Sequence, residues 1–252
     1  MAFDLTKLEK PTGQRPVIMT LFGEGGMGKT TLAAMFPKPV FIRTEDGTAS
    51  LQGNEDVAMF PLAATTQDVL DGIESLATQE HGFKTLVLDS ITQLATMIEH
   101  EIVAADPKAK SINQAGGGYG AGYSAAGEKH RQIREWAGAL AYEKGMNVVF
   151  IGHADTETMD LPDMDQYNRY SVRLHKKCIA HYTDNVDAVC MIRLKTFVRG
   201  ADGDKKRAIS TQEREIICHP QAASVTKNRF NITEPLPFTF EGGNPFDQWV
   251  AK

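Results

Sequence analysis

Short uninterrupted apolar runs recur between residues 17 and 153, and longer segments of mixed character separate them. An apolar run without alternating polar residues is typical of a strand that is buried on both faces of a parallel sheet. The runs lie at residues 17–22, 40–43, 85–89 and 147–153, with a shorter one at 57–60. The pattern therefore predicts a series of internal strands.

Helical spacing of apolar residues marks the segments between these runs, as at 66–80, where they recur every three or four positions. Proline ends the first predicted helix at Pro37 and the third before Pro107. Because strand and helix alternate, right-handed crossovers and a parallel sheet with helices on both faces are expected. The predicted helices cover residues 29–36, 66–80, 90–105 and 128–144.

The pattern changes in the second half of the chain. A glycine-rich segment at 115–127 and a polar segment at 154–170 are both interpreted as loops. Residues 186–198 and 207–218 flank the turn sequence GADGD, which predicts an antiparallel hairpin. The expected fold is α/β, with a mostly parallel sheet flanked by helices and a C-terminal antiparallel hairpin. We predict an N-terminal arm at 1–15 and a single domain at 16–252.

Composition narrows the class of protein only a little. The chain has 252 residues and a formal net charge of −5, which argues against a protein that coats nucleic acid through bulk positive charge. A local basic groove stays compatible with that charge, because salt screens distant charges. The three cysteines lack C-x-x-C spacing, and no apolar run approaches the ~18 residues of a membrane span. These features predict a cytoplasmic protein with no membrane partner, in the host cytoplasm if a phage encodes it.

A phosphate-binding loop follows the first apolar run and precedes the first predicted helix, in the form G-x-x-x-x-G-K-T. Its glycines allow successive backbone N–H groups to face one anion, and its lysine can reach the β- and γ-phosphates. The strand before and the helix after it argue against a chance match. The residues predicted to bind the nucleotide are Gly23, Glu24, Gly25, Gly26, Met27, Gly28, Lys29, Thr30 and Thr31.

Two side chains are predicted to hold Mg²⁺ at this loop. The Thr30 hydroxyl is one ligand, and Asp89, at the end of the run 85–89, is the expected carboxylate on a neighbouring strand. The alternative role for Asp89 is to cap the helix that follows, although Ser90 could do so instead.

At this point the sequence resembles the RecA-like ATPases, which share a phosphate loop, a glutamate after the next strand and an apolar strand that ends in Asp-Ser. The corresponding features here are GEGGMGKT, Glu45 and LVLDS, and FIGH supplies a polar strand end at His153. The resemblance implies a RecA-like P-loop NTPase core that uses ATP and Mg²⁺. It implies that Glu45 is the general base, with Asp46 as the alternative. It also implies that His153 senses the γ-phosphate, unless this histidine merely closes a strand.

The sequence KNRF at 227–230 resembles the KNRFG motif of the bacterial RadA (Sms) branch, with Asn231 in place of the glycine. The resemblance implies that Lys227 and Arg229 act on the nucleotide of a neighbouring subunit. Such an interface is head-to-tail and builds a homo-oligomeric ring or filament. Arg193 and Lys195 are the second candidates for this role, and a solvated basic patch is the alternative for either pair.

Together these features most resemble the phage-encoded RecA-like single-strand annealing ATPases, called the Sak-four group, over residues 16 to 240. The resemblance implies an ATP-hydrolysing, single-stranded-DNA-binding recombination or annealing protein, stimulated by DNA and partnered by a phage or host single-strand-binding protein.

The positional counterparts of the DNA-binding loops are 111–127, which contains Tyr119 and Tyr123, and 154–171, which is acidic. An alternative basic path consists of Arg169, Arg173, Lys176 and Lys177. The rival function from another class is an ATP-driven switch or loader that acts on a protein without DNA. A small-molecule kinase is disfavoured, because an acidic 154–165 loop has the wrong charge for a phosphate lid.

Overall fold

The computed structural model describes residues 15–199 and 207–252. Within these residues, ten strands form one sheet in the order β10-β8-β7-β1-β5-β4-β2-β3, with β6 paired to β5 and β9 to β7. The predicted N-terminal arm lies outside the described residues except for Arg15.

The centre of the sheet is parallel, as the continuous apolar runs predicted. Strand β1 pairs in parallel with β5 and with β7, and β4 pairs in parallel with β5 and β2. In this register Gly23 lies opposite His153 on one side and opposite Ile192 on the other. The parallel strands are β1 (Ile18–Gly23), β2 (Pro39–Arg43), β3 (Ala58–Met59), β4 (Thr85–Asp89) and the first half of β5 (Asn147–Met159).

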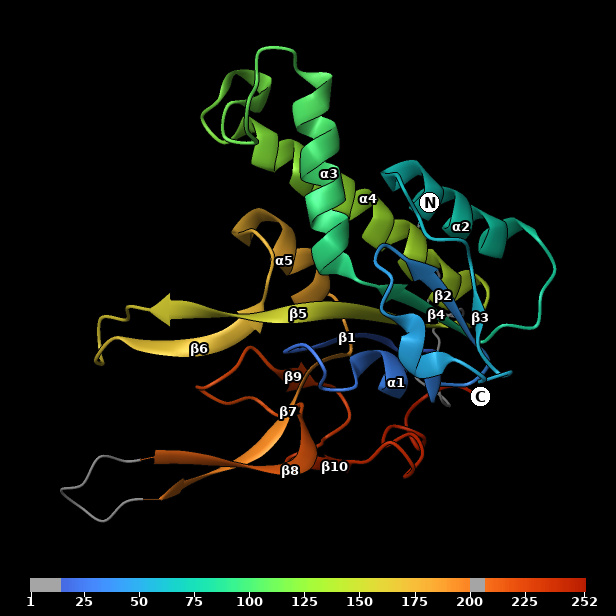
Figure 1. Ribbon diagram of the computed structural model, residues 1–252, viewed down its shortest axis with the longest axis vertical. Helices are drawn as coiled ribbons and strands as arrows, with labels where there is room; N and C mark the ends of the chain where they lie inside the picture. The colour runs from blue at the N-terminus through green and yellow to red at the C-terminus, as the bar shows by residue number, and fades with distance from the viewer. Residues whose placement is uncertain (1–14, 200–206) are drawn as a thin grey trace, which may run out of the picture.

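Helices cover both faces of this sheet (Figure 1). One face packs against α2 to α5, where Phe22, Leu88 and Phe150 are buried. The other face packs against α1 and the C-terminal segment, where Leu21 and Phe246 are buried. The helices are α1 (Lys29–Ala34), α2 (Thr66–Thr78), α3 (Ile91–Ala105), α4 (Ala121–Glu143) and α5 (Lys176–Thr183), with short 3₁₀ turns η2 (Thr48–Leu51) and η3 (Ala115–Gly117).

The segment at 154–170 is a hairpin, so the prediction of a loop was wrong. Strand β5 continues to Met159 and pairs antiparallel with β6 (Tyr167–Val172). Glu157 lies opposite Arg169 and accepts a hydrogen bond from it at 2.6 Å. Away from Ala154, Ser171 and Val172 at its base, this ribbon is exposed or half-buried, and polar residues occupy both of its faces. The alternation of apolar and polar residues that marks a half-buried strand is therefore absent from the sequence.

The second predicted loop is also shorter than expected, because α4 begins at Ala121. Gly122 lies in this helix, and packing explains the glycine there: a Cβ on Gly122 would lie 2.2 Å from the Ile112 carbonyl oxygen. Tyr123 therefore lies on α4, where its ring stacks on His175 with centroids 3.8 Å apart. Tyr119 remains in the loop and is fully exposed, at φ 52°.

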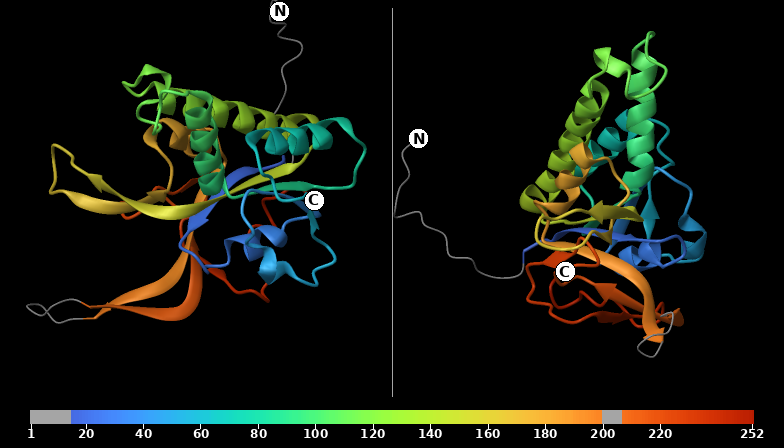
Figure 2. Two further views of the ribbon diagram at one scale, coloured as in Figure 1. Left: turned by 45° about the horizontal axis from the view of Figure 1, so that its top comes forward. Right: turned by 90° about the vertical axis from the view of Figure 1, so that its left-hand side faces the viewer.

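The predicted C-terminal hairpin is confirmed. Strands β7 (Ala188–Arg199) and β8 (Arg207–Ile217) pair antiparallel, and β10 (Leu236–Phe238) adds to β8. Both the β5–β6 and the β7–β8 hairpins project from the same side of the molecule, with a gap between them (Figure 1, Figure 2). At the opposite end of the sheet, Asn147 at the start of β5 holds the chain end through hydrogen bonds with both backbone groups of Ala251.

Asp187 joins three segments at the start of β1. Its buried carboxylate accepts hydrogen bonds from the Ile18 amide at 3.0 Å, from Arg229 at 3.2 Å and from Arg15. Its backbone carbonyl also accepts the Arg229 amide at 2.8 Å. The carboxylate therefore fixes β1 against β7 and holds the KNRF segment, which includes β9 (Lys227–Asn228), against both.

We predict that Asp187→Ala lowers the free energy of unfolding by about 2–3 kcal/mol, because it leaves a buried amide without its partner and two arginines without their counter-ion. Urea denaturation followed by circular dichroism measures this loss. Glu135→Ala is the control, since its ion pair with Arg131 is exposed and contributes little to stability. Equal losses in the two variants would contradict the role of Asp187.

Candidate nucleotide-binding site

The phosphate loop connects the end of β1 to the start of α1. Gly26 and Gly28 adopt φ values of 75° and 92°, which side chains disfavour, and this explains glycine at both positions. Lys29 folds back over the loop, where its ammonium group donates to the carbonyl oxygens of Gly23 at 3.0 Å and Glu24 at 2.8 Å. Burial lowers the pKa of Lys29, while the charges of Asp89 and Glu45 act in the opposite direction. The ammonium group is thus held on the phosphate loop itself, between the end of β1 and the start of α1.

Asp89 reaches the phosphate loop although β4 is not the neighbour of β1. The sequence pattern predicted this carboxylate on a neighbouring strand, but β5 lies between β1 and β4. The Thr30 hydroxyl donates to Asp89 Oδ2 at 2.7 Å, so the two predicted metal ligands are adjacent. Ser90, and not Asp89, caps α3 by accepting the Gln93 amide at 3.2 Å. Helix capping therefore does not account for Asp89.

Glu45 and His153 are in direct contact, which the sequence analysis did not predict. His153 Nε2 lies 3.1 Å from Glu45 Oε1. This hydrogen bond is the main cause that lowers the pKa of Glu45, so the carboxylate stays charged at neutral pH. The His153 amide donates to the Thr92 hydroxyl at 2.9 Å, which fixes the end of the strand against α3. Asp46, the alternative base, lies 3.7 Å from Arg43 and is largely exposed.

Lys227 and Arg229 lie far from the phosphate loop of their own chain. Strand β9 pairs with β7 at Ala188 and Val189, which is the end of β7 opposite Ile192 and the loop. Lys227 donates to the Asp184 carbonyl oxygen, and Arg229 contacts Asp187. Arg193 and Lys195, the second candidates for action on a neighbouring subunit, have different surroundings. Arg193 lines a cavity of about 350 Å³ together with Glu24 and Met27, but it is paired with Glu215 at 2.9 Å, and Lys195 pairs with Glu213 at 3.5 Å.

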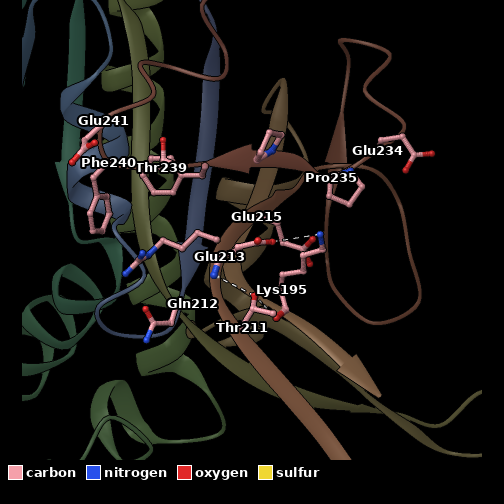
Figure 3. A pocket seen from close by; sticks show the side chains of 13 residues that line it. Lys195, Thr211, Gln212, Glu213, Glu215, Glu234, Pro235, Thr239, Phe240 and Glu241 are labelled. Atoms are coloured by element: carbon pink, nitrogen blue, oxygen red, sulfur yellow. Dashed lines mark hydrogen bonds and ion pairs between the residues drawn. The ribbon is translucent and has the colours of Figure 1, made fainter. Parts of the chain in front are cut away.

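A further cavity lies beside the phosphate loop and was not anticipated from the sequence. It has a volume of about 1080 Å³ between β8, β10 and residues 239–241 (Figure 3). The half-exposed ring of Phe240 lines it and also lies against the loop, since a Cβ on Gly28 would be 2.4 Å from Phe240 Cε1. The Arg214 guanidinium lies 4.3 Å from the centroid of the same ring. No sequence motif marks this segment, so only the fold reveals its position.

These features define a P-loop NTPase, in which an apolar strand, a glycine-rich loop and a strand-end acid form one nucleotide-binding site. The model of the AAA_24 family, described as an AAA domain, matches residues 15–230, and the chain belongs to this family. No curated protein shows a significant match to the sequence. Within residues 15–199 and 207–252, no helix combines the length and the apolar character that crossing a membrane requires.

We predict that Lys29→Ala weakens nucleotide binding roughly 10- to 100-fold, because it removes a charge-assisted hydrogen bond to the phosphates. Hydrolysis should fall below detection. Isothermal titration with a non-hydrolysable nucleotide measures the affinity, and Lys144→Ala, an exposed lysine after α4, is the control. Normal turnover in Lys29→Ala would overturn the assignment of the loop.

Proposed function

We propose that this protein binds Mg²⁺-ATP, hydrolyses it, and uses the hydrolysis to act on single-stranded DNA in recombination or annealing. The observation that carries the hydrolysis is the convergence of Lys29, the Thr30–Asp89 pair and the Glu45–His153 pair. They come from the segments that follow β1 and β2, from the end of β4 and from the middle of β5.

The residues at this point fit a divalent cation. Asp89 is buried, and burial raises its pKa, so a cation beside it would stabilise the charged carboxylate. Its close partner is a hydroxyl, and oxygen ligands of this kind suit Mg²⁺. Thr30 and Asp89 would hold the ion, which would neutralise charge on the β- and γ-phosphate oxygens.

Glu45 is the proposed general base. A water oxygen forms a bond to the γ-phosphorus while the bond from that phosphorus to the bridging oxygen breaks, and ADP leaves with the electron pair. The carboxylate of Glu45 accepts the proton of the attacking water. His153 orients this carboxylate through the 3.1 Å hydrogen bond, and it links the carboxylate to the start of the β5–β6 hairpin. The presence of the γ-phosphate is thereby coupled to that hairpin.

We predict that Glu45→Gln binds ATP with nearly unchanged affinity and hydrolyses it about 10²–10⁴-fold more slowly, since the amide keeps the shape of the side chain but cannot accept the proton. Single-turnover phosphate release measures the rate. Asp46→Asn should leave turnover unchanged, and the reverse result would move the base to Asp46.

The DNA-binding part of the proposal rests on the resemblance to the Sak-four group and on the exposed loop before α4. Gly116, Gly117, Gly118 and Gly120 surround Tyr119 with positive φ values, so the backbone presents this ring fully to solvent. An exposed aromatic ring can stack on an unpaired base without sequence preference. Lys177 fastens the loop to α5 by donating to the Gly120 carbonyl oxygen and to the Ser124 hydroxyl.

Assembly into a ring or filament is part of the same proposal. Because Lys227 and Arg229 lie at the edge of the sheet opposite the phosphate loop, they can act only on the nucleotide of another copy. A head-to-tail contact brings such opposite edges together. The proposed function also includes strand annealing and contact with a single-strand-binding protein.

We predict that single-stranded DNA raises the ATPase rate, and that this stimulation weakens steeply with salt because phosphate contacts release counterions. Tyr119→Ala should weaken DNA binding by about 1–3 kcal/mol. Tyr142→Ala, an exposed tyrosine on α4, is the matched control. An ATPase rate that ignores single-stranded DNA at every salt concentration would favour the alternative, a switch or loader that acts on a protein.

A further inference from the structure

A second cation besides Lys29 lies near the phosphate loop, and it comes from the same chain. The antiparallel pairing of β5 and β6 places Val172 opposite Ala154, so the next residue, Arg173, lies beside His153. The Arg173 amide donates to the His153 carbonyl oxygen at 2.8 Å. The polypeptide therefore positions Arg173 at the strand end that carries the Glu45–His153 pair.

The side chain of Arg173 lies at a cavity that the phosphate loop shares. This cavity of about 340 Å³ is lined by Glu24 and Gly25 of the loop, by His153 and by Arg173. One guanidinium nitrogen donates to the Ala154 carbonyl oxygen at 3.1 Å. The positive charge of Arg173 also contributes to the lowered pKa of Lys29, behind the larger effect of burial.

Arg173 has the charge and the freedom that phosphate binding requires. Among the described residues that line the cavity, it is the only guanidinium or ammonium group, while Glu24 and Asp155 are carboxylates. None of the ion pairs formed by the described residues involves Arg173. By contrast, Arg193 is held by Glu215 and Arg229 by Asp187.

We propose that Arg173 is a catalytic residue that binds the γ-phosphate of the nucleotide held by its own chain. This inference rests on the proposed ATP hydrolysis. The guanidinium would donate to the γ-phosphate oxygens, where charge accumulates as the bond to the bridging oxygen breaks. Fixed donors aimed at developing charge lower the barrier because they need no reorganisation during the reaction. In this chain the hairpin contributes directly to the chemistry.

The test compares Arg173→Ala and Arg173→Lys with wild type, using ATP hydrolysis without DNA and the affinity for a non-hydrolysable ATP analogue. Arg173→Ala should lower kcat by about 10²–10³-fold and change the analogue's Kd by less than about threefold. Arg173→Lys should recover part of the rate. Added guanidinium should restore turnover to Arg173→Ala and not to Lys29→Ala, a response that a structural role would not produce. Arg131→Ala, on the surface of α4, is the arginine control and should match wild type.

Mixed subunits separate action within the chain from action across an interface. If Arg173 acts on its own nucleotide, a mixture of Arg173→Ala and Lys29→Ala stays inactive, because neither subunit holds a complete site. Recovered turnover in that mixture would overturn the inference. Arg229→Ala mixed with Lys29→Ala is the comparison, since a residue acting across the interface predicts recovery there.

The remaining outcomes are distinct. A kcat of Arg173→Ala within about threefold of wild type overturns this inference and leaves the proposed hydrolysis intact. The same holds if Arg173→Ala loses only DNA binding. A wild-type protein that hydrolyses no nucleotide removes both proposals.

Discussion

The register of β1 between β5 and β7 is the constraint on which the site depends. It places Gly23, the last residue of β1, opposite His153 and Ile192 at once. The approach is so close that a Cβ on Gly23 would lie 2.4 Å from the Ile192 carbonyl oxygen. A shift of one residue would turn every side chain of β1 to the other face and separate the loop from the strand ends that serve it. Asp187 holds the same register at the far end of β1, so the phosphate loop is aligned by contacts at both ends of one strand.

Two hairpins extend this parallel core on the side of the nucleotide. The β5–β6 pairing begins at Ala154, directly after His153, and the β7–β8 pairing begins at Met191, beside Ile192, so each hairpin continues a strand that flanks the phosphate loop. Tyr170 and Glu24 line both the cavity that contains His153 and the cavity that contains Ile192. In the proposed mechanism, the backbones of β5 and β7 connect the nucleotide site directly to both hairpins.

The sequence predicted those parts of the fold that local patterns encode. The continuous apolar runs predicted the internal strands, and the segments on either side of GADGD pair as β7 and β8, as predicted, while GADGD itself lies outside the described residues. The phosphate-loop motif pointed to Lys29 and Thr30. The features that the sequence did not predict depend on contacts between segments that are distant in the chain. The β5–β6 ribbon has no apolar alternation because it is exposed. The glycine at position 122, in the first turn of α4, is explained by the close approach of Ile112, which leaves no room for a Cβ.

In the candidate site, too, local patterns predicted some features, whereas others depend on how distant segments come together. Asp89, Glu45 and His153 were each predicted from their place at a strand end, since parallel strands bring such ends to one edge of a sheet. The insertion of β5 between β1 and β4, the contact between Glu45 and His153, and the position of Arg173 all follow from sheet order and from a hairpin that the sequence did not reveal. The approach of Phe240 to Gly28 spans more than two hundred residues of chain and has no local signature.

The anchoring of Ala251 by Asn147 has a practical consequence for handling this protein. It sets the chain end at the start of β5, at the edge of the sheet that also carries Lys227 and Arg229 and faces away from the phosphate loop. A bulky group fused after Lys252 would leave the nucleotide face open while it crowds the surface expected to meet the next copy. The position of an affinity tag therefore offers a way to hinder the proposed assembly, while the nucleotide site of the isolated subunit stays accessible.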